Sequence, residues 1–246
     1  SLCESRLVST LKIPWWSMRS TRTWPEAWMM WVLLVRMPTW LTAPAVLMKN
    51  AVKIEAANFQ KKQHGSAPFR LISIAHFRPD KDHINLLKAF KKLINIHSDW
   101  SLHLVGQDFG DEYSKKIRSF IEENTLENHV FIYGSCLDIS NILNQSTIGV
   151  LSSKSEGLPL ALLEYGLAKL PIVVTNVGDC NLVVKNESLG RLVEPNNEQV
   201  LYYAFIEFIQ NPKVGKKTGE ALYNHINKNY GKEQAINKLI KIYQEI

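Results

Sequence analysis

Two glutamates, Glu156 and Glu164, are the side chains in this sequence whose spacing and surroundings best suit ligand chemistry. They bound the stretch Ser-Glu-Gly-Leu-Pro-Leu-Ala-Leu-Leu-Glu, which follows a small polar turn and runs into a leucine-rich segment. The turn is typical of a strand-to-helix loop, and the apolar segment is typical of a helix. Pro159 suits the first helical turn, where its missing N–H costs nothing. Unpaired N–H groups and the dipole at a helix start favour a phosphate, and Gly157 allows close backbone approach.

The two carboxylates have separate expected tasks. Glu156 lies on the loop, where it can face a bound sugar. Glu164 lies about two turns into the expected helix, and its side chain leans back toward the helix start, where it can accept both hydroxyls of a ribose. The alternative is structural: Glu156 completes a capping box with Ser153, and Glu164 is a solvated helix residue.

Strands and helices must alternate around this stretch to position it. Apolar runs typical of strands lie at 69–75, 101–106, 129–133, 147–151, 171–175 and 190–193. Helical patterns lie at 83–97, 111–124 and 137–143, after Pro159, and at 196–210, 213–228 and 231–245. This alternation predicts an α/β fold with a doubly wound, Rossmann-like parallel sheet. The sequence lacks the Gly-x-Gly-x-x-Gly fingerprint, which argues against an NAD or FAD enzyme.

Doubly wound sheets bind ligands at the carboxyl ends of their strands, where the strand order reverses. The loops at 75–82, 106–110, 133–136, 152–157 and 175–180 are therefore the candidate binding loops. The first of them carries His76, Arg78 and Lys81. Cations beside a helix N-terminus are suited to a diphosphate.

Composition excludes several function classes. The net charge is +6 at pH 7, but six basic and two acidic side chains lie in residues 1–49, which leaves +2 for the other 197 residues. We therefore expect no nucleic-acid partner for the main body. The three cysteines are far apart and show no metal-ligand or disulfide spacing, which suits a reducing cytoplasm.

Residues 1–49 differ from the rest of the chain and hold six of its seven tryptophans. We expect an irregular leader here and a single Rossmann-like domain over residues 50–246. The apolar run from Trp28 to Val35 is too short for a membrane span of roughly 20 residues. Tryptophan mixed with basic residues leaves open a peripheral membrane contact.

The sequence from about Asn50 to Ile246 resembles the C-terminal, donor-binding domain of the retaining GT-B glycosyltransferases, the "group 1" family (family four). The most specific piece is the Glu-x7-Glu motif of Glu156 and Glu164. Lys81, within Pro-Asp-Lys-Asp-His, matches the family lysine.

This resemblance implies roles residue by residue. Glu156 and Lys81 take the catalytic positions. The donor diphosphate is bound by His76, Arg78, Lys81, Gly157 and Leu158. Glu164 binds the ribose, while Tyr133 and Gly134 line the base. No essential metal and no cofactor is implied.

Two departures from the family pattern matter. The family arginine falls on His76, and Arg78 is expected to replace it because of its longer reach. The 49-residue leader is also too short to be the N-terminal GT-B domain that carries the acceptor site.

The expected function is retaining transfer of a hexosyl group from a nucleotide-diphosphate sugar, with UDP or GDP as the nucleotide. The acceptor is a glycan or a lipid-linked glycan of polysaccharide biosynthesis, and the location is cytoplasmic, at or near the inner membrane face. A truncated, non-catalytic nucleotide-sugar-binding module is the alternative, and a sugar-nucleotide epimerase or a phosphorylase is a weaker one.

Overall fold

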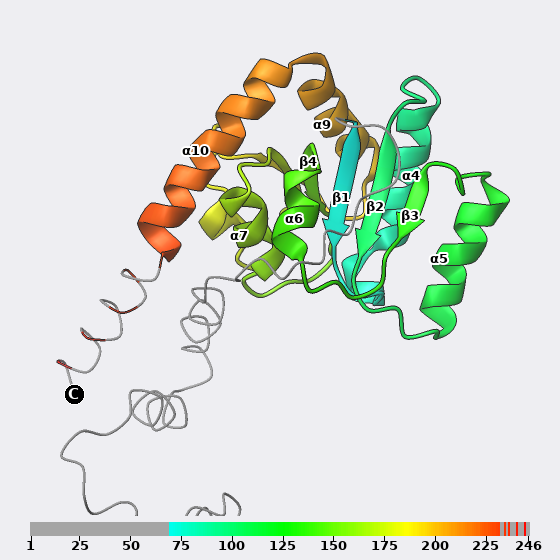
Figure 1. The fold of residues 1–246 in the computed structure, drawn as a ribbon, viewed down its shortest axis with the longest axis horizontal. Coiled ribbons are helices and arrows are strands. Elements are labelled where there is room, and N and C mark those ends of the chain that lie inside the picture. The colour runs from blue at the N-terminus through cyan, green and yellow to red at the C-terminus, as the bar shows by residue number, and fades with distance from the viewer. Residues whose placement is uncertain (1–68, 232–233, 235, 237–239, 241–243, 245–246) are drawn as a thin grey trace, which may run out of the picture. The chain divides into compact units, whose positions relative to one another are not determined.

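A computed structural model describes residues 69–231 and, beyond them, the helical positions 234, 236, 240 and 244 (Figure 1). The predicted leader at 1–49 and the predicted domain start at residue 50 lie outside the described residues, as does most of the predicted helix at 231–245.

Six parallel strands form one sheet in the order β3-β2-β1-β4-β5-β6. The strands are β1 (Arg70–Ile74), β2 (Ser101–Val105), β3 (Val130–Ile132), β4 (Ile148–Leu151), β5 (Ile172–Thr175) and β6 (Arg191–Val193). The chain builds outward from β1 to β3, then returns to the middle and builds outward on the other side from β4. The order therefore reverses between β1 and β4, which makes this junction the topological switch point. The predicted doubly wound α/β fold is confirmed.

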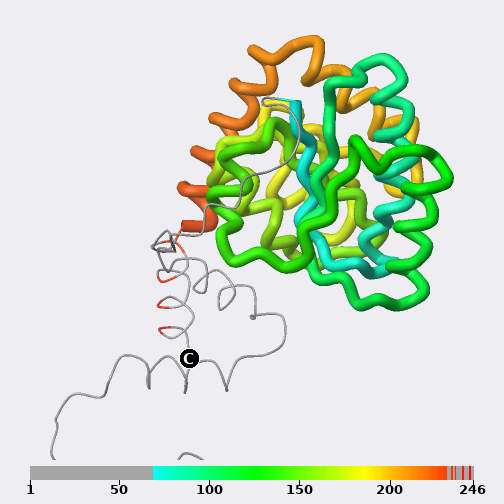
Figure 2. The backbone as a smooth tube through the Cα atoms, turned by 45° about the vertical axis from the view of Figure 1, so that its right-hand side comes forward, coloured from blue at the N-terminus to red at the C-terminus, as the bar shows by residue number. Residues whose placement is uncertain are grey.

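Helices cover both faces of the sheet. They are α4 (His83–Ile94), α5 (Glu112–Glu123), α6 (Ile139–Asn144), α7 (Leu160–Leu167), α8 (Cys180–Val183), α9 (Glu198–Gln210) and α10 (Pro212–Tyr230), with a short 3₁₀ helix η3 (Pro79–Lys81). Figure 2 follows the chain from β1 in cyan to α10 in orange and red. The short elements η3 and α8 were not predicted. Pro159 is the residue before α7 rather than part of its first turn, because its ψ of 120° is extended.

The sheet separates two apolar cores, and neighbouring residues of one strand point into different ones. In β1, Leu71 packs in the core under α4, α5 and α9, whereas Ile72 packs in the core under α6, α7, α8 and α10. Both side chains are fully buried. This two-sided burial explains why central strands such as β4 and β5 appear in the sequence as mainly apolar runs.

Tyr165 of α7 fills the place where β1 and β4 diverge. The two strands pair at Leu71 with Ile148 and at Ile72 with Gly149. Beyond that point the Tyr165 hydroxyl accepts a hydrogen bond from the Ile74 N–H (2.7 Å) and donates to the Val150 carbonyl (3.2 Å). Full burial raises the pKa of this phenol far above its usual range. A neutral hydroxyl therefore joins the two strands at the switch point.

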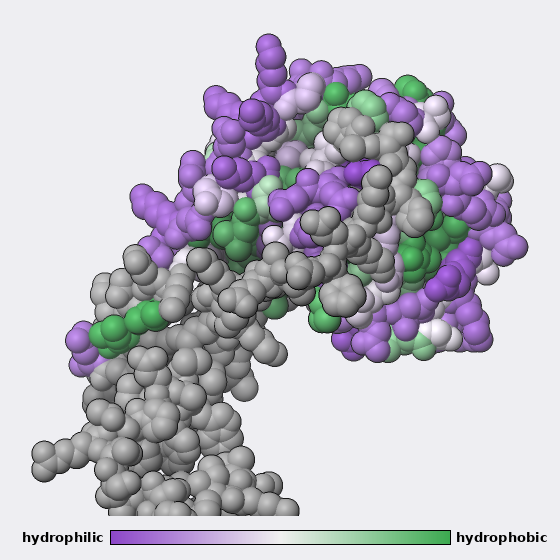
Figure 3. Space-filling view, in the orientation of Figure 1, coloured by the Kyte–Doolittle hydropathy of each residue, from purple (hydrophilic) through white to green (hydrophobic). Residues whose placement is uncertain are grey.

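Hydrophilic side chains cover most of the face seen in Figure 3, and apolar ones show in separate areas. Among the described residues, no helix is long and apolar enough to cross a bilayer.

Candidate functional site

The loops after β1 and β4 are joined directly at the switch point. The Lys154 N–H donates to the Asp80 carbonyl (2.7 Å), and the Ser152 hydroxyl donates to the Lys81 carbonyl (3.0 Å). The Lys154 ammonium also lies 3.2 Å from a carboxylate oxygen of Asp82. These contacts fix one loop against the other, although 70 or more residues separate them in sequence.

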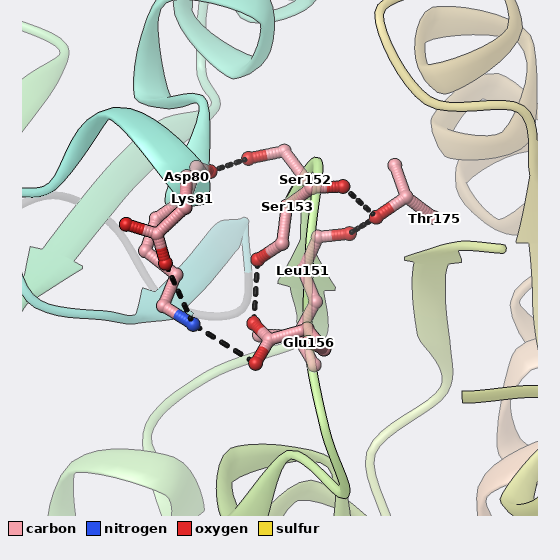
Figure 4. A network of polar contacts seen from close by, with 7 residues as sticks. All are labelled: Asp80, Lys81, Leu151, Ser152, Ser153, Glu156 and Thr175. Atoms are coloured by element: carbon pink, nitrogen blue, oxygen red, sulfur yellow. Dashed lines mark hydrogen bonds and ion pairs between the residues drawn. The ribbon is translucent and has the colours of Figure 1, made fainter. Parts of the chain in front are cut away.

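Lys81 and Glu156 meet across this junction (Figure 4). The Lys81 Nζ lies 2.9 Å from Glu156 Oε2, and the two side chains are only 20% and 10% exposed. The Ser153 hydroxyl donates to the other oxygen, Glu156 Oε1, at 2.6 Å. The contact between Ser153 and Glu156 joins two side chains and lies well before α7, which begins at Leu160. The capping-box alternative for Glu156 is therefore wrong.

The loop after β5 packs against the loop that carries Glu156. Gly178 has a φ of +52°, and a Cβ added to it would lie 1.9 Å from the Glu156 carbonyl oxygen. The Asp179 N–H donates to the Gly157 carbonyl (3.2 Å), and the Thr175 hydroxyl donates to the Ser153 carbonyl (2.7 Å). Three of the candidate loops named from the sequence therefore lie together at one edge of the sheet.

Gly157 faces open space, and Leu158 after it is half-buried. A Cβ added to Gly157 would have no heavy atom within 4 Å, and the residue is exposed. Neither of these two N–H groups donates to another residue of the described part of the chain. The arrangement leaves both N–H groups without a partner among the described residues, and that of Gly157 lies on an exposed residue.

Glu164 lies in the middle of α7 and is half-buried. Removal of its carboxylate from water raises its pKa above the usual range. Within residues 69–231 no hydrogen bond or ion pair links its side chain to Glu156 or Lys81. Its ribose role stays a prediction.

His76 and Arg78 are both exposed on the loop after β1. The His76 Nδ1 accepts a hydrogen bond from the Gln107 N–H (3.0 Å), so that nitrogen already has a partner. Arg78 directly precedes η3, and its guanidinium has no hydrogen-bond or ion-pair partner in the described part of the chain. Arg78 is therefore the freer of the two groups for an anion.

Tyr133 and Gly134 follow β3, two strands away from the switch point. The Tyr133 hydroxyl lies 2.9 Å from His103 Nδ1, and the two rings stack with centroids 5.6 Å apart. Gly134 has a φ of +67°, and its carbonyl accepts from the Gly106 N–H (2.9 Å). These contacts fix the loop, while the base-lining role of both residues stays a prediction.

Sequence reasoning missed Ser153 and Thr175 as members of the site. Both are buried polar residues, 1% and 0% exposed. The signal that was available is position: each lies at the carboxyl end of a strand that carries a candidate loop.

A parallel sheet of this order, with polar loops gathered at its switch point, defines the class as a Rossmann-like α/β domain. The model of one family, "Glycosyl transferases group 1", matches residues 55–225. The chain belongs to this family, and the predicted family membership is confirmed.

Two relatives illustrate the match. The chain is 27% identical over 175 residues to a glycosyltransferase of Methanocaldococcus jannaschii, covering 70% of this chain and 47% of the relative. It is 28% identical over 177 residues to the UDP-Gal:alpha-D-GlcNAc-diphosphoundecaprenol alpha-1,3-galactosyltransferase of Escherichia coli, covering 71% and 45%. The chain therefore spans about half the length of these relatives.

Solved structures show the same fold. A glycosyltransferase from Rickettsia africae matches with a TM-score of 0.66 and 25% identity, over 82% of this chain and 52% of that one. HepE of Anabaena, in complex with UDP, matches with a TM-score of 0.69 and 17% identity, over 84% and 55%. These neighbours are GT-B glycosyltransferases, as the sequence analysis predicted for the fold.

Proposed function

We propose that this chain is the donor-binding half of a glycosyltransferase that moves a hexosyl group from a nucleotide-diphosphate sugar with retention at the anomeric carbon. The observation that carries this proposal is the juxtaposition of Lys81 and Glu156 beside the open backbone of Gly157, at the switch point of a group 1 family domain.

The chemistry requires stabilisation of the negative charge that grows on the departing nucleotide diphosphate. Fixed cations and backbone N–H dipoles supply this most effectively when they are in place beforehand. Lys81 is held within the site, Arg78 is exposed beside it, and the N–H groups of Gly157 and Leu158 are unpaired within the described part of the chain. In the proposal these four groups bind the diphosphate, with His76 at the margin.

Glu156 then accepts hydrogen bonds from the hydroxyls of the donor sugar, and Glu164 binds the ribose. Tyr133 and Gly134 line the base. The proposal includes no essential metal and no cofactor. It places the protein in the cytoplasm, with an acceptor that is a glycan or a lipid-linked glycan of polysaccharide biosynthesis. A further GT-B domain would carry the acceptor site.

Isothermal titration calorimetry with UDP, GDP and their sugars tests the proposal. We expect one of these ligands to bind the wild-type chain, and to bind a Lys81→Met variant at least tenfold more weakly, because one charge-assisted phosphate contact is lost. No binding of any of them to the wild-type chain would refute the proposal. A radiolabelled transfer assay then separates an active enzyme from a module that binds nucleotide without turnover.

A further inference from the structure

Glu156 is held by two partners of different character, one on each carboxylate oxygen (Figure 4). Oε2 faces the ammonium of Lys81 at 2.9 Å, from the loop after β1. Oε1 accepts a hydrogen bond from the hydroxyl of Ser153 at 2.6 Å, within the same loop. Each oxygen of the carboxylate therefore has one partner from the protein itself.

A diphosphate that binds at this loop competes for the first partner. The diphosphate carries more negative charge than one carboxylate and therefore attracts the Lys81 ammonium more strongly. The Lys81 ammonium also lies 3.4 Å from an Asp80 carboxylate oxygen, so it is shared between two carboxylates. Movement of Lys81 toward the diphosphate would free Glu156 Oε2 to accept a hydroxyl of the sugar. It would also leave the glutamate side chain, with its several rotatable bonds, without that restraint.

Contacts on its side chain and backbone would keep Ser153 in place while Lys81 moves from Glu156 to the diphosphate. Its side chain is buried, and its carbonyl is fixed by the hydroxyl of fully buried Thr175 at 2.7 Å. The Thr175 hydroxyl also lies 3.4 Å from the Leu151 carbonyl, so it connects the end of β5 to the last residue of β4 and to Ser153 in the loop that follows. The backbone of Glu156 is held in turn by its close approach to Gly178.

From this geometry we infer that Ser153 is a positioning residue: its hydroxyl keeps Glu156 aimed at the donor sugar once Lys81 has moved to the diphosphate. The inference rests on the proposed function. It assigns the buried end of β4 a part in sugar recognition, through Glu156 rather than through contact with the ligand.

The test compares two ligands, because only the sugar-bearing one uses Glu156. Dissociation constants are measured by calorimetry for a nucleoside diphosphate and for its sugar, taking the pair that the wild-type chain binds best among UDP with UDP-glucose and GDP with GDP-mannose. For Ser153→Ala we expect about tenfold weaker binding of the nucleotide sugar and unchanged binding of the nucleoside diphosphate. Ser153→Thr keeps a hydroxyl and should restore most of the loss. Ser155→Ala, an exposed serine of the same loop, is the matched control and should change neither constant.

Equal weakening of both ligands in Ser153→Ala would show a merely structural role and overturn the inference. Unchanged binding of both would overturn it as well, while the proposed function would stand. Absence of binding to the wild-type chain would instead refute the proposed function and the inference together. Should Ser153→Ala fail to fold, Ser153→Cys serves the same comparison, because its thiol has a similar volume but is a weak donor.

Discussion

Replacing Tyr165 with Phe tests whether one hydroxyl holds the sheet together at its switch point. The ring remains, so its packing against Gly149 is kept, while the Ile74 N–H loses its acceptor and the Val150 carbonyl loses a donor. Tyr165 and Val150 are fully buried and Ile74 is half-buried, which limits how far water can replace the lost partner. An unsatisfied buried polar group costs about 1–3 kcal/mol.

We expect the free energy of unfolding of Tyr165→Phe to fall by about 2 kcal/mol, the cost of one orphaned N–H with a smaller contribution from the carbonyl. For a domain of this size that corresponds to a decrease in Tm of about 4–8 °C. Urea unfolding followed by circular dichroism measures the first quantity, and a thermal scan measures the second.

Tyr203→Phe is the matched control, since Tyr203 is 61% exposed on α9. Its unfolding free energy should stay within about 0.5 kcal/mol of the wild-type value. If Tyr165→Phe is as stable as this control, the hydroxyl does not brace the two strands, and the account of the switch point given above is wrong.

Three further predictions concern the loops and α7. Glu164→Gln should raise the Tm at pH 7, because burial raises the pKa of Glu164: the charged form is disfavoured in the folded state, so stability is lost as pH rises through the folded pKa. The Tm difference between the variant and the wild type should vanish in scans below about pH 4, where the carboxyl is protonated in both the folded and the unfolded state. In calorimetry the same variant should bind nucleotide about 1–2 kcal/mol more weakly. Unchanged affinity would remove Glu164 from the ribose site. Gly157→Ala should weaken diphosphate binding with no change in Tm. Gly178→Ala should lower the Tm, because the added Cβ would meet the Glu156 carbonyl and because the backbone at Gly178 is left-handed. Equal Tm values for the two variants would contradict these roles of the two glycines. Arg78→Ala should weaken UDP or GDP binding far more than uridine or guanosine binding in the same titrations, and equal losses would show that Arg78 does not contact the phosphates.

The sequence was enough to predict the fold because the central strands are buried on both faces, so β4 and β5 appear as short, almost wholly apolar runs. The meeting of Lys81 with Glu156, 75 residues apart, was also predictable, since both follow strands that flank the reversal in strand order. These expectations depend only on strand direction and topology.

Other features depend on tertiary contacts that leave no local pattern. The helices η3 and α8 have three and four residues, which are too few to show a repeating helical pattern in the sequence. The hydrogen bond from Thr175 to Ser153 joins two loops whose separation in space is set by packing of the whole sheet. Tyr165 appeared in the sequence as one more apolar residue of a helix, because nothing local indicates that its hydroxyl reaches two strands.

The pairing of β1 with β4 has a consequence for how a bound ligand would act on the protein as a whole. The two halves of the sheet meet in register at only two residue pairs, and beyond these the junction is closed by side chains. A molecule that contacts the loops of both halves would hold the two halves together at this junction, the seam between β1 and β4, and suppress its transient opening. Amide hydrogens near the seam, such as that of Ile74, should then exchange with deuterated solvent more slowly in the liganded protein, while amides at the outer edge strands β3 and β6 keep their rates.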